Sequence, residues 1–453
     1  MTAPNSNTRT ETWAFGALLA TVASIVFSIA LGQIMAGLCA LCFATALIRR
    51  ETAWKMPALA WLGLAFVTVA ITGSACAGGT TGLWGRTGKL LWFLLLPITV
   101  TLIRTPQRAM QVVWAFLGGG VILALRDLIL HPLKASRHPV PDFMTALIDK
   151  GSMTDGQMLM LAVVAGTAVI LVFMRNGRNV PSLLWLMLTV QMAGLLINFK
   201  RGSWFCAVLL VGVLLVSHLR WRGWLVALAL MIGLAALPPV QNRLTGLSRE
   251  LTRADGRLAM WTAVAPALVR EHPMGIGYGR LTSDMMKKAW PRIEPNRNHL
   301  HANWAQVLVE TGWIGFGIYL AWMAASVVQA VRALQASRVD PRDLASRVKE
   351  VEPDSQRDLD PRDLASRVKE VESNSQRDLD PRDLASRVKE AEPDKAPAMA
   401  RVVAPVILLM LAGLLLNGFV EYNFGDTELM FVYAIVLALA TGGWQGRHEA
   451  RTV

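Results

Sequence analysis

Acidic side chains are scarce in this sequence outside one short segment. Residues 340–395 contain 16 of the 32 Asp and Glu residues, together with 12 of the 45 Lys and Arg residues. The remaining 397 residues carry 33 basic and only 16 acidic side chains. Ordinary soluble domains are about 25% charged, whereas this 453-residue chain is 17% charged and 53% hydrophobic, with a mean hydropathy of +0.41. The composition excludes an ordinary soluble enzyme and predicts a basic membrane protein.

Cysteine and nucleotide-binding motifs are also lacking. The chain has four cysteines, and Cys39 and Cys42 form a C-x-x-C inside an apolar run without a second pair of ligands, so we interpret them as small hydrophobic residues. No P-loop, kinase signature or acidic metal-binding cluster is present. The first twelve residues are polar, and no clear cleavage site separates the apolar stretch after them from the next one. We therefore expect a retained first helix, no metal and no cofactor.

Twelve apolar stretches approach the length of about 20 residues that a bilayer-spanning helix needs. The pattern predicts an all-α polytopic membrane protein of about twelve transmembrane helices, although the short second stretch also allows eleven. The predicted spans are 13–31, 33–48, 56–74, 88–103, 109–127, 156–174, 181–198, 203–218, 223–239, 308–331, 400–418 and 427–443.

Basic residues in the short loops orient these spans. Arginines and lysines follow the second, fourth, sixth, eighth and twelfth spans, which all end on one side of the membrane under the twelve-span count. The positive-inside rule makes that side cytoplasmic, together with both termini. The long segments 128–155 and 240–300 then lie outside, in the periplasm of a Gram-negative cell.

This layout predicts one large external loop and one internal repeat. The repeat DPRDLASRVKEVEPDSQRDL at 340–359 recurs at 360–379 and, truncated, at 380–395. It is too polar to bury a core, and we interpret it as a linker expansion. The predicted organisation is a cytoplasmic tail over 1–12, nine spans within 13–239, a periplasmic loop over 240–300, a re-entry and tenth span over 301–331, a cytoplasmic loop with the repeats over 332–399, two spans within 400–443 and a cytoplasmic tail over 444–453.

Several cations lie on the predicted external side of the membrane, where the positive-inside rule disfavours them. They are therefore candidates for a functional role. Lys200 and Arg201 occupy the tight turn NFKRGSW between the seventh and eighth spans. Interfacial snorkelling is one explanation, but we favour an anion site. Arg86 and Lys89, at the head of the fourth span, give a weaker form of the same signal and leave both interpretations open.

The loop 240–300 carries ten Lys and Arg residues against five Asp and Glu. Arg257 and Trp261 are four residues apart and share a helix face if this stretch is helical. A glycine-rich turn follows in PMGIGYG, where glycines permit positive φ or a close backbone approach. Because no strand precedes this turn and it opens no dinucleotide-binding helix, we expect a tight loop packed on the membrane domain.

Two of the seven histidines, His299 and His301, stand where the external loop re-enters the membrane. Their i, i+2 spacing would point them to different helix faces, and no acidic or cysteine cluster accompanies them, which disfavours a metal site. An interfacial pair without a role is possible, but imidazole titrates near neutrality and we favour acid–base chemistry by at least one of them. A basic external cavity with aromatic residues suits a lipid-linked diphosphate that carries a saccharide; the aromatic candidates are Trp84, Trp204, Trp261, Tyr278 and Trp304.

Three motifs in residues 190–320 together resemble the O-antigen ligase and polymerase superfamily. HANWAQVLVETGWIG resembles the family's HN-x-x-L-Q-x-L-x-E-x-G-x-x-G stretch, although Ala302 replaces the Asn and Asn303 comes one place late. NFKRGSW resembles an S-R-G-x-W turn, with Lys200 in place of the usual small residue. GRLAMW followed by PMGIGYG resembles R-x-x-x-W … P-x-G-x-G-x-G.

The resemblance implies a membrane glycosyltransferase of GT-C-like architecture that is metal-independent and inverting. Its ligase subgroup moves O-antigen from undecaprenyl diphosphate to a sugar hydroxyl of lipid A–core on the periplasmic face of the inner membrane. By this resemblance Arg201 and Arg257 would hold the diphosphate, and His301 would accept or steer the acceptor's proton. The resemblance also implies further phosphate contacts by Lys200, Arg86 and Lys89. It implies supporting roles in the substrate site for Tyr278, Trp261 and His299.

Three alternatives remain open at the level of sequence. An O-antigen polymerase would use the same donor, and Arg201 and Gly212 fit the spacing that such polymerases show, but Gly212 falls deep in a span. A protein O-oligosaccharyltransferase often has an extra C-terminal external domain. A transporter of polyprenyl lipid or saccharide would show repeated spans and charges near the bilayer midplane.

Overall fold

A computed structural model describes residues 8–78, 83–137, 151–236, 240–241, 253, 256–293, 297–337 and 395–441. These residues form helices, turns and loops without a strand, which fits the predicted all-helical class. The first half comprises α1 (Arg9–Ile25), α2 (Ile29–Ile48), α3 (Ala58–Gly78), α4 (Leu83–Thr87), the 3₁₀ helix η1 (Gly88–Leu94), α5 (Leu95–Leu102), α6 (Pro106–Ser136) and α8 (Met153–Arg175). The second half comprises α9 (Ser182–Asn198), α10 (Arg201–Leu219), α11 (Trp221–Ala236), α13 (Arg257–Ala259), the π turn η2 (Met260–Val264), α14 (Ala265–Glu271), α15 (Ser283–Ala289), α16 (Asn303–Ala336), α20 (Lys395–Val420) and α21 (Thr427–Ala440).

The described part of each of the twelve predicted spans is mostly helical, but the helices differ in length. Seven of those described are long and apolar enough to cross a membrane, namely α2, α3, α6, α8, α10, α16 and the 399–420 part of α20. The chain is therefore a multi-pass membrane protein. The stretches 88–102, 182–198, 221–233 and 427–440 are apolar helices of 10 to 17 residues. The twelve-span count and the orientation stay predictions, and the repeats lie outside the described residues.

The predicted boundary between the first two spans was wrong. Helix α1 ends at Ile25 and α2 begins at Ile29, inside the stretch 13–31 that was predicted as one span. The reason is local, because the Ser28 side chain accepts a hydrogen bond from the backbone N–H of Leu31 and caps α2. Residues 9–12, predicted as tail, are helical, and Arg108 and Arg104 pair with the buried carboxylate of Glu11 at 2.7 and 3.3 Å.

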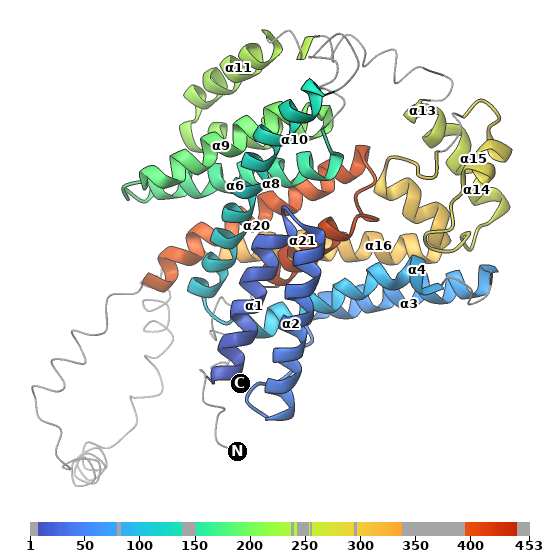
Figure 1. Ribbon diagram of the computed structural model, residues 1–453, viewed down its shortest axis with the longest axis horizontal. Helices are drawn as coiled ribbons and strands as arrows, with labels where there is room; N and C mark the ends of the chain where they lie inside the picture. Colours follow the sequence, from blue (N-terminus) through green and yellow to red (C-terminus); the bar gives the residue numbers. More distant parts are fainter. Residues whose placement is uncertain are drawn as a thin grey trace, which may run out of the picture.

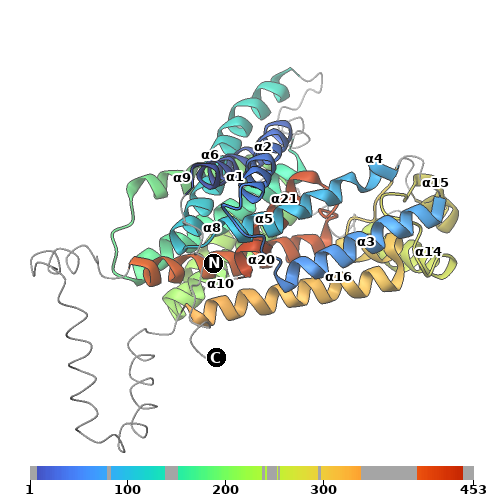
Figure 2. The ribbon, with the colours of Figure 1, turned by 90° about the horizontal axis from the view of Figure 1, so that it is seen from below.

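The C-terminal helices form the centre of the bundle, surrounded by the other long helices (Figures 1 and 2). Helix α21 is buried along its whole length and α8 along most of it, because nearly every side of these helices is apolar. The loop between α20 and α21 is anchored in the same core. Its fully buried Phe424 packs its ring at 5.4 to 5.7 Å from the rings of Phe66, Phe93, Tyr319 and Tyr433.

Helices α13, α14 and α15 form a small unit at one end of the molecule, beside the ends of α3 and α4 in both views (Figures 1 and 2). The unit has a hydrophobic core of its own that includes Met260, Leu268 and Met286. Ser74 Oγ, in α3, donates to the carbonyl of Tyr278 at 3.2 Å and ties the unit to the long helices. Helical segments therefore form most of the described part of the predicted external loop.

The glycine-rich turn packs against a kink in α16. Gly312 has a φ of +65° inside this helix, and the N–H groups of Ile276 and Gly277 donate to the carbonyls of Val309 and Glu310 just before the kink. A Cβ on Gly275 would lie 2.5 Å from the Glu310 carbonyl oxygen, so the two backbones meet only because glycine is present. The turn is the tight packing loop that the sequence predicted.

Candidate functional site

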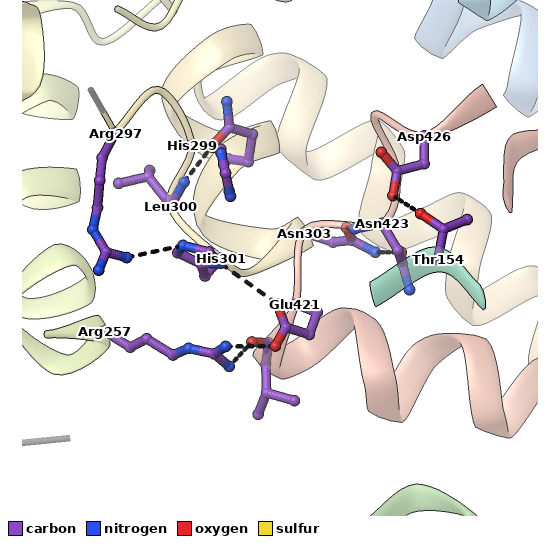
Figure 3. A network of polar contacts seen from close by, with 12 residues as sticks. Thr154, Arg257, Arg297, His299, Leu300, His301, Asn303, Glu421, Asn423 and Asp426 are labelled. Carbon is purple, nitrogen blue, oxygen red and sulfur yellow. Dashed lines mark hydrogen bonds and ion pairs between the residues drawn. The ribbon is translucent and has the colours of Figure 1, made fainter. Parts of the chain in front are cut away.

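Three separate parts of the chain meet at one end of the helices, where charged side chains are brought together. They are the start of α13, the loop 297–302 before α16, and the loop 421–426 between α20 and α21. Figure 3 shows Arg257 and His301 pointing toward Glu421 from two of these parts. The cluster thus joins residues that are 120 and 164 positions apart in the sequence.

Glu421 is the centre of this cluster. Arg257 donates from Nη2 to Glu421 Oε1 at 2.5 Å and from Nη1 to the carbonyl of Val420 at 2.6 Å. Glu421 Oε2 lies 3.5 Å from His301 Nδ1. Burial raises the pKa of the Glu421 carboxyl, but the His301 contact and the Arg257 guanidinium outweigh it, so the pKa lies below its usual value. Glu421 is therefore a buried, paired carboxylate.

The partners of His301 fix which ring nitrogen carries the proton. Arg297 Nη1 lies 3.1 Å from His301 Nε2, and a guanidinium can only donate, so Nε2 is the acceptor. Nδ1 then carries the hydrogen and faces the Glu421 carboxylate. His301 has a φ of +50°, a left-handed conformation that costs on the order of 1–3 kcal/mol and often marks functional sites. The imidazole is thus held with its basic nitrogen directed away from Glu421.

Asn303, directly after the loop that carries His301, connects this loop to the loop 421–426. Its side-chain oxygen accepts from the N–H groups of Asn423 and Phe424, each at 2.9 Å, and its amide donates to Asn423 Oδ1 at 2.5 Å. Asn303 is buried, so these bonds are shielded from water. On the other side of His301, the Trp261 indole N–H donates to the Leu300 carbonyl at 2.9 Å. Trp261 therefore contacts the loop that carries His301, and its supporting role in the reaction stays a prediction.

His299 and His301 lie in a loop and not on a helix, so the prediction that they point to different helix faces was wrong. Helix α16 begins only at Asn303, and the two imidazole rings contact each other with centroids 4.2 Å apart. Burial, followed by the nearby His301, lowers the pKa of His299 to about 4. His299 is therefore neutral near neutral pH.

The Lys200–Arg201 turn reaches the same cluster. Phe199 ends α9 in a left-handed conformation with a φ of +58°, and α10 starts at Arg201. Trp204 donates from Nε1 to the Leu195 carbonyl at 2.7 Å and closes the turn. A Cβ on Gly202 would lie 3.8 Å from Glu421 Cγ. The structure therefore places this turn beside Glu421, and the role of Arg201 at the diphosphate stays a prediction.

A polar cavity of about 520 Å³ is lined by Glu421 and His299 but not by Arg257 or Arg297. Of the predicted residues, Lys89, Tyr278 and His299 line it. Lys89 donates from Nζ to the Gly425 carbonyl at 2.9 Å, and the buried Tyr278 hydroxyl donates to the Phe424 carbonyl at 3.1 Å. Arg86 belongs to α4, but its side chain lies outside the described residues.

Residues 183–320 match the family model described as O-antigen ligase. This segment of 138 of the 453 residues is similar to the O-antigen ligase/polymerase superfamily. The match contains seven of the predicted site residues, namely Lys200, Arg201, Arg257, Trp261, Tyr278, His299 and His301. The chain matches no curated protein sequence.

The similarity links the chain to glycosyltransferase-like enzymes of lipopolysaccharide biosynthesis, a process whose substrates are lipid-linked O-antigen and lipid A–core. It does not by itself distinguish a ligase from a polymerase.

The sequence prediction missed the residues of the last loop, Glu421, Asn423 and Asp426, which also lie beyond the family match. The available signal was weak. Two carboxylates stand in the ten residues NGFVEYNFGD between two apolar stretches, but acids on the external side break no topological rule. Their importance follows only from their contact with Arg257, His301 and Thr154.

One group of side chains in the described part of the chain has the composition of a metal site. The ligand atoms of Asp127, His131 and Asp155 lie within 4.8 Å of one another. However, Arg126 forms ion pairs with Asp127 at 2.9 Å and Asp155 at 2.6 Å. The guanidinium supplies the positive charge that these carboxylates need, and we assign no metal there.

Proposed function

We propose that this protein is an O-antigen ligase that transfers the glycan from undecaprenyl diphosphate to a sugar hydroxyl of lipid A–core. The observation that carries the proposal is the contact of Glu421 with both Arg257 and His301, at 2.5 and 3.5 Å. A carboxylate that orients an imidazole, next to a guanidinium, supplies a base and a site for an anionic leaving group. The similarity of residues 183–320 to the O-antigen ligase family supports the same reaction class.

His301 acts as the base in this proposal. Glu421 holds Nδ1 and stabilises the imidazolium that forms, while Nε2 takes the proton of the acceptor hydroxyl. The acceptor replaces Arg297 as the hydrogen-bonding partner of Nε2. The hydroxyl oxygen then forms its bond to the anomeric carbon as the bond from that carbon to the diphosphate oxygen breaks, with inversion.

The arginines stabilise the leaving group. Arg257 uses two of its five N–H donors on Glu421 and Val420, which leaves others for diphosphate oxygens. Arg201 stands on the adjacent turn and Lys200 precedes it, and both are proposed to share the same anion. The departing undecaprenyl diphosphate carries the negative charge, and guanidinium groups neutralise it as a metal ion does in other enzymes. Arg86 is proposed as an outer phosphate contact.

The reaction is proposed to take place on the periplasmic face of the bacterial inner membrane, with both termini in the cytoplasm. Basic residues in five short loops support this orientation. The site lies at the opposite end from those loops under the twelve-span topology. A GT-C-like arrangement of the helices is part of the same proposal.

The test is complementation of a ligase-deficient strain, read on a lipopolysaccharide gel at matched membrane expression. Wild type should restore the O-antigen ladder. His301→Ala should give rough core with lipid-linked O-antigen of normal chain length, because loss of a general base costs roughly 10²- to 10⁴-fold. His272→Ala, at a half-exposed histidine, is the matched control and should behave as wild type.

Failure of the wild-type chain to restore a ladder in a host with the cognate O-antigen would contradict ligase function. Restored chain polymerisation in a polymerase-deficient strain would instead favour the polymerase. Full ligation by His301→Ala would leave the ligase assignment standing and reject the role of the histidine.

A further inference from the structure

The cavity of about 520 Å³ and the arginines lie on opposite sides of His301 and Glu421. In Figure 3, Arg257 and Arg297 approach His301 and Glu421 from one side, and Asp426 and Thr154 lie on the other. Neither arginine lines the cavity, whereas His299, Glu421 and Asp426 do. A substrate at this border therefore meets two chemically different surfaces.

The described lining of the cavity is acidic. It contains three carboxylates, Glu310, Glu421 and Asp426, against one cation, Lys89. Burial raises the pKa of the Asp426 carboxyl, although the hydrogen bond from Thr154 and the charge of Lys89 act in the other direction. The one cation of the described lining, Lys89, already donates to the Gly425 carbonyl. This lining therefore does not gather cations for a phosphate group and suits an uncharged polar ligand.

The cavity also offers hydrogen-bond acceptors that need donors. Gln157 lines it, is 2% exposed, and its Oε1 has no hydrogen-bond partner in the described structure. Asp426 Oδ2 accepts from Thr154 Oγ1 at 3.1 Å, and Gln157 lies one helical turn after Thr154 on α8. Buried acceptors are nearly always satisfied in the working state of a protein. The missing donors are hydroxyl or amide hydrogens, which a saccharide supplies in quantity.

We propose that this cavity binds neutral sugar residues of the acceptor, with Gln157 and Asp426 accepting hydrogen bonds from ring hydroxyls. This assignment rests on the proposed ligase function and specifies where its second substrate lies. In an inverting displacement the nucleophile approaches opposite the leaving group. With the diphosphate at Arg257, the attacking hydroxyl meets His301 Nε2 beside Arg297, and the neighbouring core sugars extend past His299 into the cavity. The volume falls in the range of about 300–1,000 Å³ typical of small-molecule sites.

The test measures the kinetics of each substrate separately, with purified full-length protein in nanodiscs, undecaprenyl-diphosphate-linked O-antigen and lipid A–core. Gln157→Met keeps the size of the side chain and removes its acceptor, and Asp426→Asn keeps the shape and removes the charge. Each should raise KM for lipid A–core by about tenfold with unchanged kcat and unchanged KM for the donor. Gln335→Met, the same change at an exposed position near the far end of α16, should alter neither KM.

A rise in KM for the donor alone would overturn the assignment and place the donor's own saccharide in the cavity. Unchanged KM values for both substrates would show that the cavity holds neither. A second measurement is independent of ligation: saturation-transfer NMR with delipidated, dephosphorylated core oligosaccharide. Signal transfer from wild type that is weakened in both variants supports the saccharide site even if the chain proves to be no ligase, and its absence from wild type rejects the site.

Discussion

The basic and the acidic segments of the site differ in how they are built. Residues 256–301 carry seven Lys and Arg residues against three Asp and Glu, spread over three short helices and their loops. Residues 417–426 carry two carboxylates and no cation in ten residues, and Phe424 and Asn303 fix this loop against the core. Glu421, Asn423 and Phe424 of the acidic segment are buried, and Arg257 and His301 of the basic segment contact it through Glu421.

This difference indicates that Glu421 organises the cluster and the cations follow. Arg257 and His301 come from different parts of the chain, and each of them contacts Glu421. Removing the charge of a buried carboxylate with two such partners strongly destabilises the cluster, because the charge of its partner is then left buried without compensation. The comparison therefore predicts that changes in the acidic segment have the larger effects.

The largest expected effect is that of Glu421→Gln. The amide keeps the shape but provides neither an ionic partner for Arg257 nor a carboxylate for His301 Nδ1, so we expect kcat for ligation to fall by about 10³-fold. The matched control is Glu271→Gln, which breaks the exposed ion pair with Lys288, a kind of pair worth about 0–1 kcal/mol. Equal kinetics of the two variants in the nanodisc assay would show that the acidic segment has no special role.

A smaller effect is expected from Arg257→Lys. Lysine keeps the charge but cannot bond Glu421, Val420 and a diphosphate in the fixed directions of a guanidinium. We expect kcat/KM for the lipid-linked donor to fall by roughly tenfold to a hundredfold, with KM for lipid A–core unchanged. Arg270→Lys, at an exposed position of α14, controls for the substitution itself. A loss confined to the acceptor KM would contradict the assignment of Arg257 to the diphosphate.

The smallest effect concerns stability and pH. His299 has a pKa of about 4 in the folded protein against 6.5 as the ordinary value. Between these values the unfolded chain binds a proton that the folded protein does not. The free energy of unfolding therefore has its full value above pH 6.5 and decreases as the pH drops toward 4. His299→Gln removes this contribution. Thermal unfolding in detergent should show a steeper loss of stability for wild type than for the variant between pH 7.5 and 4.5, and parallel curves would refute the shift.

Sequence patterns located the cations better than the carboxylates. Lys200 and Arg201 stood out because the positive-inside rule disfavours them on the external side, and the structure places their turn beside Glu421. The motif around His301 lies directly before the start of α16 at Asn303, and the re-entry into the membrane stays a prediction. The i, i+2 argument for His299 and His301 failed because it assumed a helix, whereas the chain enters α16 only at Asn303. The position of Asn303, one place late in the motif, gained meaning only from its bonds to Asn423 and Phe424.

The sequence by itself determined the all-helical class and the position of the apolar helices, since both depend on local composition and on the length a bilayer requires. It also determined the basic character of the external loop. Only the tertiary structure decided which carboxylate meets Arg257 and His301, and which cavity opens beside them. Those pairings join residues more than a hundred positions apart, and hydropathy carries no information on contacts at such separations. They are set by how Phe424 and Asn303 anchor the last loop in the core.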